Sequence, residues 1–386
     1  MATQPGLLIP VELSATTAWT RLLGVSDNDI ATALTTGSDG AIYASVNTIS
    51  ASDPISALIN GSVVSAFITK YNADGTQVWT KQLGTTDNKV ATSLSTGSDG
   101  SIYISGSTID ILGLLTNSSV INAFVTKYNA DGTEIWTKQL ETTDNKIATA
   151  LSTGSDGSIY ISGNIASGSA IDILSGLINS SSSNTTIITD VFVTKYNADG
   201  SQVWTKLLET SDNDVARSIT TGSDGAIYVS GNTRGNLDGQ TNNGGDDAFI
   251  TKYNADGTKV WTKLLGTGGD DVARSLTIGS DGAIYVSGNT KGDLDGQTNN
   301  GGDDAFITKL FTTLNNPPTD LSLDTTTIDE GQTTVGNLTT TDPDTGNTFT
   351  YSLVTGDGAT DNSLFTITNN QLKTNSVFDF ETKNSY

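Results

Sequence analysis

Residues 214–265 read DVARSITTGSDGAIYVSGNTRGNLDGQTNNGGDDAFITKYNADGTKVWTKLL. Runs of alternating apolar and polar residues predict four short β-strands, over 215–221, 226–232, 248–253 and 258–265. Asp-Gly dipeptides end the turn sequences GSDG (222–225) and NADG (254–257), and their glycines supply the positive φ of a tight hairpin turn. The stretch therefore predicts a unit of four antiparallel strands.

The same unit recurs along most of the chain. Its tryptophan is found at Trp19, Trp79, Trp136, Trp204 and Trp261. The aspartate of GSDG is found at Asp39, Asp99, Asp156, Asp224 and Asp281. The phenylalanine of the third strand is found at Phe67, Phe124, Phe192, Phe249 and Phe306. Four antiparallel strands in a repeat of about 60 residues are typical of one blade of a β-propeller.

The order of the motifs indicates how such a propeller would close. The tryptophan strand TAWTRLLG (17–24) precedes the first full repeat, and the last repeat stops after AFITKL (305–310). If the N-terminal strand pairs with AFITKL, the fifth blade is completed and no strand edge stays open. We therefore expect an all-β protein with a tail over 1–14 and a five-bladed β-propeller over 15–311, closed by an N-terminal strand.

A family resemblance supports this interpretation. The succession of S-D-G, IYV-S-G and DAF-I-TKYN-ADG-x-x-W-T resembles the bacterial β-propeller repeat known as the SBBP repeat. The similarity is greatest at GNLDGQTNNGGDDAFITKY (235–253), which recurs at 292–309, and it covers about residues 15–311. The resemblance implies a propeller and carries no catalytic signature.

The repeat ends at the NNPP linker, within 312–318, and residues 319–386 have a different character. Strand-like runs such as DLSLDTTTI (320–328), VGNLTTT (335–341) and FTYSLVTG (349–356) predict a small β-sandwich. NNPPTDLSL, IDEG, TTTDPDTGNTFTYSL and VFDFETKNSY together resemble a bacterial cadherin-like repeat. The chain ends where the sixth of seven strands is expected, so we expect a partial cadherin-like β-sandwich that belongs to a longer protein.

The cadherin-like resemblance also implies a set of Ca²⁺ ligands. They are an early acidic residue, an Asp-x-Asp pair, a late Asp-x-Glu motif and a linker asparagine: Glu330, Asp342, Asp344, Asp379, Glu381 and Asn316. The alternative is that these residues form solvated turns, which Asp and Asn favour because their side chains bond nearby backbone N–H groups.

Composition narrows the possible chemistry. Nineteen basic and 42 acidic residues give a formal charge of −23, which argues against nucleic acid and anionic membrane surfaces as partners. The chain contains no Cys and no His, which leaves carboxylates, hydroxyls and amides, the oxygen ligands that suit Ca²⁺. No apolar run approaches the roughly 20 residues of a membrane helix, and no basic residue precedes Arg21, so we expect neither membrane insertion nor an ordinary signal peptide.

One face of the propeller is expected to be acidic. The loops that join successive blades carry Asp27, Asp87, Asp144, Asp212 and Asp270. The loops between the second and third strands of blades four and five add Asp238, Asp246, Asp247, Asp295, Asp303 and Asp304. This face could bind cations, a protein or a carbohydrate, or it could simply be solvated. The GSDG and NADG turns lack the spacing of a calcium loop and are interpreted as hairpin turns.

These patterns favour a non-enzymatic, monomeric interaction or adhesion module of a large bacterial surface or secreted protein. The first alternative is a lectin-like, carbohydrate-binding propeller. The second is a glycosidase, which needs two carboxylates at a set separation in one pocket. The aspartates instead recur with the blades, and Arg217 and Arg274 occupy the first strands of blades four and five. We therefore expect no enzymatic activity.

Overall fold

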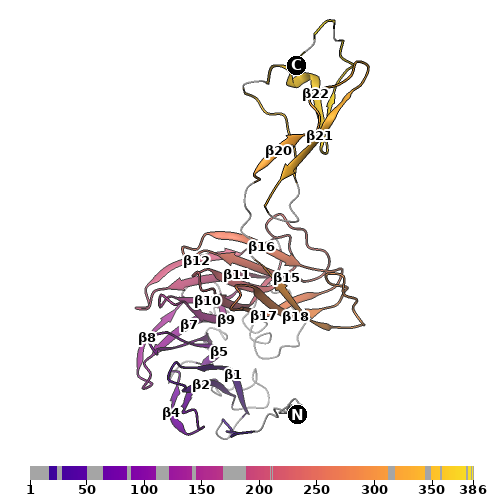
Figure 1. The fold of residues 1–386 in the computed structure, drawn as a ribbon. Helices are drawn as coiled ribbons and strands as arrows, with labels where there is room; N and C mark the ends of the chain where they lie inside the picture. The colour runs from indigo at the N-terminus through magenta and orange to yellow at the C-terminus, as the bar shows by residue number, and fades with distance from the viewer. Residues whose placement is uncertain are drawn as a thin grey trace, which may run out of the picture. The chain divides into compact units, whose positions relative to one another are not determined.

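The computed structural model divides into two compact units, Met1–Leu310 and Phe311–Tyr386. It describes residues 17–23, 28–49, 64–84, 88–109, 121–140, 145–167, 188–208, 210, 212–311, 318–343, 349–356, 359–379, 381–383 and 385. Each unit consists of antiparallel β-sheet (Figure 1). Among the described residues, no helix is long and apolar enough to cross a bilayer.

The first unit contains five successive sheets, named here blades one to five. Blade one comprises β1 (Asn28–Thr36), β2 (Ile42–Ile49), β3 (Val64–Tyr71) and β4 (Gln77–Gln82). Blade two comprises β5 (Asn88–Thr96), β6 (Ile102–Ile109), β7 (Ile121–Tyr128) and β8 (Glu134–Gln139). Blade three comprises β9 (Asn145–Thr153), β10 (Ile159–Ser167), β11 (Ile188–Tyr196) and β12 (Gln202–Leu208). Blade four comprises β13 (Asp214–Thr221), β14 (Ile227–Thr233), β15 (Asp247–Tyr253) and β16 (Lys259–Leu265). Blade five comprises β17 (Asp271–Ile278), β18 (Ile284–Thr290) and β19 (Asp304–Leu310). The predicted four-stranded antiparallel unit is therefore confirmed in four repeats.

The Asp-Gly turns close hairpins, as their sequences predict. In blade four the Gly222 N–H donates to the Ala226 carbonyl at 2.8 Å, and the Ala226 N–H donates to the Asp224 carboxylate at 3.0 Å. The second turn is closed by the Asn254 N–H and the Thr258 carbonyl at 2.9 Å. Gly225 and Gly257 have φ of 76° and 83°, which residues with a Cβ adopt at a cost. The backbone N–H and C=O groups of these turns are thus hydrogen-bonded within the turn, which supports the interpretation as hairpin turns.

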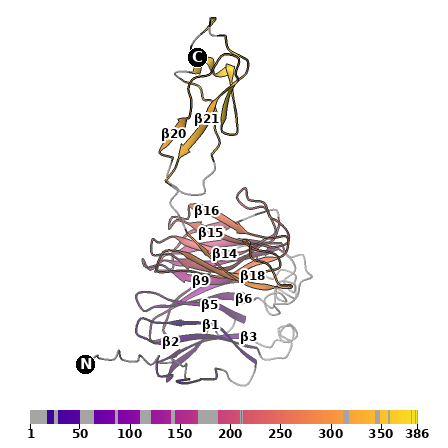
Figure 2. The same cartoon turned by 45° about the vertical axis from the view of Figure 1, so that its right-hand side comes forward.

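Successive blades pack face to face through a repeated apolar contact. In four consecutive interfaces the buried first-strand residue of one blade joins a core cluster with the third-strand residue of the blade before it. The pairs are Leu94 with Ile68, Leu151 with Val125, Ile219 with Val193, and Leu276 with Ile250. Figure 2 shows the first strands β1, β5 and β9 side by side in chain order. The core of the unit therefore lies between sheets.

The predicted closure of the ring is not formed in this structure. The two halves of the apolar contact that would join blade five to blade one are open: Leu34 is 70% exposed and Ile307 is 81% exposed. Their counterparts elsewhere in the unit are at most 7% exposed, for example Leu94 and Ile68. In the part of the chain that the structure describes, β19 is an edge strand and residues 17–23 form no strand. Closure by the N-terminal segment therefore stays a prediction; in this structure the Trp19 and Arg21 side chains donate to the turn that follows β3 in blade one.

The N-terminal segment nevertheless occupies part of the position that closure requires. The Trp19 indole N–H donates to the Ala73 carbonyl at 3.1 Å, as the Trp79 indole donates to the Ala130 carbonyl at 3.3 Å. The Trp19 ring also lies against Gly75. Toward blade one, Trp19 thus substitutes for the tryptophan of a preceding blade.

The second unit is a four-stranded antiparallel sheet with the order β20-β21-β23-β22. Its elements are β20 (Asp320–Leu323), β21 (Thr334–Thr341), the 3-10 helix η1 (Ala359–Leu364), β22 (Phe365–Thr368) and β23 (Gln371–Thr374). The expected strand over 349–356 is wrong, since the described residues 349–354 carry no strand. Within the described part of this unit there is one sheet, so a two-sheet cadherin-like sandwich stays a prediction.

Candidate functional site

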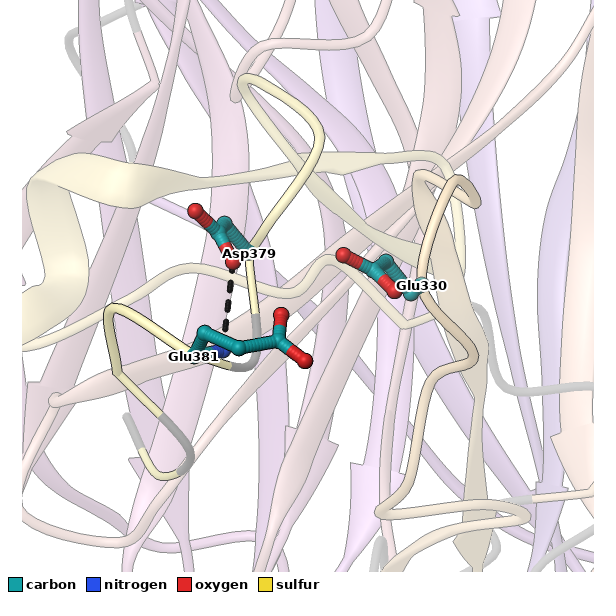
Figure 3. Close-up of side chains that lie close together, drawn as sticks. All are labelled: Glu330, Asp379 and Glu381. Atoms are coloured by element: carbon teal, nitrogen blue, oxygen red, sulfur yellow. Dashed lines mark hydrogen bonds between the residues drawn. The ribbon is translucent and has the colours of Figure 1, made fainter.

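Three of the predicted Ca²⁺ ligands come together in the second unit. Glu330 lies in the connection between β20 and β21, whereas Asp379 and Glu381 follow β23. One carboxylate oxygen of each lies within 4.8 Å of those of the other two (Figure 3). All three side chains are exposed. The fold therefore brings together carboxylates that are about 50 residues apart in the sequence.

Local hydrogen bonds hold one member of this acidic triad in place. One Asp379 carboxylate oxygen accepts the Glu381 backbone N–H at 3.1 Å, the bond dashed in Figure 3. The other accepts the Thr382 hydroxyl at 2.8 Å. Hydrogen bonds from Thr382 and Glu381 lower the pKa of Asp379 from its usual value, because they favour the charged form. The triad thus contains an oriented, ionised carboxylate.

The other predicted ligands do not join this group. Asp342 follows β21 and is not part of the triad. Asp344 and Asn316 lie outside the described residues. Three exposed carboxylates repel one another, and a hard cation with oxygen ligands would relieve that repulsion. The chemistry of the donor set fits Ca²⁺.

On the first unit, ion pairs neutralise several of the aspartates expected on the acidic loop face. Arg234 pairs with Asp246 at 3.0 Å, and Lys291 pairs with Asp270 at 2.7 Å. A further pair joins Lys259 to Asp238. The joining-loop residues Asp27, Asp87 and Asp144 lie outside the described residues.

Backbone hydrogen bonds bring two of these loops together at the junction of blades four and five. The Gly245 N–H donates to the Gly269 carbonyl at 3.1 Å, and the Asp246 N–H donates to the Asp270 carboxylate at 3.2 Å. The loop between β14 and β15 and the loop between the two blades therefore lie on one face, as the strand order predicts.

Sequence reasoning missed two buried aspartates at the starts of first strands. Asp214 begins β13 and Asp271 begins β17, and both are fully buried. The repeat alignment contained a signal for them, because Lys89 and Lys146 occupy the same position in blades two and three. A reversal of charge at one position of a repeat marks a site where the local environment differs.

Comparisons with known proteins agree with the repeat fold. Residues 260–295 match the family model described as "Beta-propeller repeat". The regulatory protein FlaEY of Caulobacter vibrioides is 29% identical over 247 residues, which cover 57% of this chain and 25% of that protein. An uncharacterized WD repeat-containing protein of Acanthamoeba polyphaga mimivirus is 24% identical and covers 45% of this chain. The chain spans a quarter or less of the length of both relatives.

Similarity to solved structures is weaker. A protein of unknown function from Dyadobacter fermentans shares 14% identity with a TM-score of 0.44, over 77% of this chain and 86% of that one. The family match at residues 260–295 and the recurring four-stranded sheets support a β-propeller repeat fold in the first unit.

Proposed function

We propose that the chain is a non-enzymatic interaction module of an extracellular or cell-surface protein, in which the acidic triad binds Ca²⁺. The observation that carries the proposal is the convergence of Glu330, from the connection between β20 and β21, with Asp379 and Glu381, from the segment after β23. Ca²⁺ accepts carboxylate oxygens in flexible geometry, and the sites of extracellular modules often bind it weakly, at about 10⁻⁴–10⁻³ M. The ion would tie the connection before β21 to the segment after β23, and so rigidify the unit that follows the propeller.

The first unit supplies the binding surface of this module. We propose that the five blades close into a ring in which β19 pairs with the N-terminal segment. Two observations support closure: the docking of Trp19 on blade one, and the exposure of Leu34 and Ile307 as unused halves of a repeated contact. A groove of about 730 Å³ also runs along β19, lined in part by Phe306 and Ile307. The loop face of the ring would then carry a protein ligand.

The proposal is tested by Ca²⁺ titration of the full chain. Isothermal calorimetry and hydrogen exchange over 330–341 and 371–383 should show binding and protection at 5–10 mM Ca²⁺, roughly above the weak end of extracellular modules. Glu330→Gln should remove most of the protection in these two segments, together with the part of the heat that belongs to the triad. The exposed Asp320 in β20 offers a charge-matched control, and Asp320→Asn should retain them.

Asp342→Asn separates two versions of the site. If the triad alone binds the ion, this variant keeps parental affinity. If the full cadherin-like ligand set operates, the variant loses affinity. Absence of Ca²⁺ heat and of protection in the parent chain would overturn the proposed function.

Carbohydrate binding is the second candidate function, and two arginines favour it. Arg217 and Arg274 are the bulged residues of β13 and β17, since the strand registers skip them. Bulges redirect side chains out of the regular ladder. Both arginines are exposed residues, and their Nε atoms donate to Asn232 and Asn289 at 2.9 and 2.6 Å. Two neighbouring guanidinium groups suit carboxylated or sulfated sugars, because guanidinium binds such anions in a bidentate way. Binding to a glycan array that is lost in Arg217→Gln would establish this function.

A further inference from the structure

A second group of acidic side chains lies inside the junction between blades four and five. Asp247 begins β15 and Asp271 begins β17. Neither side chain has measurable solvent exposure. The Cα of Gly266 approaches the Asp247 carboxylate so closely that a Cβ there would lie 2.1 Å from its carbon. The junction is therefore closed over both carboxylates.

Each buried carboxylate uses only one of its two oxygens for hydrogen bonding. Asp271 Oδ2 accepts the backbone N–H of Thr267 at 2.6 Å and the hydroxyl of the same residue at 2.8 Å. Asp247 Oδ2 accepts the Asn243 N–H at 3.0 Å. The Oδ1 atoms of Asp247 and Asp271 are buried and have no hydrogen-bond partner. Since an unpaired buried charge is costly, these oxygens need a proton or a cation.

The nearby cations on the loop face are already paired. Arg234 binds Asp246 and Lys291 binds Asp270, and these two aspartates flank the buried pair in the sequence. Burial raises the pKa of Asp247, and the negative charges of Asp271 and Asp246 raise it further. The junction thus holds more negative charge than its own basic residues compensate.

The corresponding junction between blades one and two shows what can occupy this space. There Ser65 aligns with Asp247, and Lys89 aligns with Asp271. The Lys89 side chain is buried, and a Cβ on Gly84 would lie 3.3 Å from its Nζ. Gly84 is the counterpart of Gly266, whose Cα approaches the Asp247 carboxylate. The junction between blades one and two therefore contains the ammonium group of Lys89. The junction between blades four and five contains two carboxylates at the corresponding place.

We propose that Asp247 and Asp271 bind a divalent cation, Ca²⁺, through their unpartnered Oδ1 atoms in the junction between blades four and five. The ion supplies the positive charge that Lys89 supplies between blades one and two. Carboxylate oxygens are the ligands of a hard cation, and two charged ligands neutralise its charge. The ion links the third strand of one blade to the first strand of the next.

The junction between blades three and four differs in one respect. Asp214 aligns with Asp271 and is buried, with Oδ1 unpartnered. Its counterpart Asp190 is only half-buried and has a further interaction. The structure therefore assigns the ion to the junction of blades four and five alone.

The test uses the full chain carrying Glu330→Gln and Asp379→Asn, which silences the triad of the second unit. Hydrogen exchange is followed in segments 243–247 and 266–271, which contain the amides of Asn243, Thr267 and Asp271. Added Ca²⁺ should slow exchange in both segments by up to about 100-fold when its free concentration is 100 times Kd. Segment 88–96, which contains Lys89, should not respond.

Substitutions identify the ligands. Asp271→Asn should abolish the Ca²⁺ response, whereas Asp256→Asn, at the turn after β15, removes the same charge and should retain it. Asp271→Lys imitates blade two, so it should fold, raise the melting temperature in chelator and remove the response. A buried carboxylic acid pair is the competing explanation: it predicts no Ca²⁺ effect at any pH. That result, or a full response in Asp271→Asn, would overturn the assignment. Since the triad is silenced throughout, failure here leaves the proposed function untouched.

Discussion

The indole of Trp204 lies over the backbone of Gly257, the glycine of the NADG turn in the next blade. The distance from the Trp204 ring to a Cβ at Gly257 would be only 2.9 Å. The same indole N–H donates to the Ala255 carbonyl at 3.3 Å, and the ring is tilted against Tyr160 with centroids 6.1 Å apart. This contact recurs from blade to blade, and it explains why tryptophan and the turn glycine share one repeat.

Trp204→Ala should lower the free energy of unfolding by about 3 kcal/mol. This is the low end for a Trp truncation, because the ring is half-buried. Urea unfolding followed by far-UV circular dichroism measures the loss. Trp204→Phe keeps an aromatic ring and should lose less. A Trp204→Ala variant within 0.5 kcal/mol of the parent would mean that the ring does not join the blades.

Gly257→Ala should destabilise the chain more than Gly225→Ala. Both glycines have similar positive φ, 83° and 76°, so in both variants the backbone conformation lowers the free energy of unfolding by about 1–2 kcal/mol. A Cβ at Gly225 meets open space, whereas one at Gly257 meets the Trp204 ring and the Lys206 side chain. Overpacking adds about 1–3 kcal/mol. Equal losses in thermal or urea unfolding would contradict the role assigned to the close approach.

Closure of the ring can be tested by cross-linking, because the chain contains no cysteine. In a closed ring Leu34 and Ile307 would meet as Leu94 and Ile68 do. Leu34→Cys combined with Ile307→Cys should then form an intramolecular disulfide on mild oxidation, visible as a faster-migrating monomer in non-reducing electrophoresis. The control pairs Leu34→Cys with Val260→Cys, an exposed position on β16 that closure does not bring near. Only disulfide-linked dimers in the test variant would show that the two edges meet between chains instead.

Asp214 predicts a pH dependence of stability. Burial raises the pKa of Asp214 to about 6, against about 3.9 in an unfolded chain. The folded state therefore binds more protons than the unfolded state between these values, and stability falls as pH rises from about 4 to 6. The loss due to this group is about 2–3 kcal/mol. Asp214→Asn should remove that part of the slope in urea unfolding measured with chelator present, while Asp212→Asn, at an exposed residue of the same segment, should keep it. An unchanged slope in Asp214→Asn would contradict the raised pKa.

Much of this protein was determined by local sequence. Strand alternation, the GSDG and NADG turns and the recurrence of tryptophan predict antiparallel four-stranded units, because periodicity and positive-φ glycine act over a few residues. The order of the motifs also identified Trp19 as a tryptophan that precedes the first full repeat and has no blade of its own. The two acidic residues of the late Asp-x-Glu motif, Asp379 and Glu381, were found from resemblance to a known repeat.

Tertiary structure decided what depends on contacts between distant residues. Only the fold shows that Glu330 meets Asp379 while Asp342 does not, and that Leu34 and Ile307 stay exposed. Only burial distinguishes Asp247 and Asp271 from the solvated aspartates around them, since all of them are the same residue type in the sequence. Their Oδ1 atoms are left without a partner by the packing of two blades. The electrostatic cost of a carboxylate is set by its surroundings, which the chain acquires only when its repeats stack.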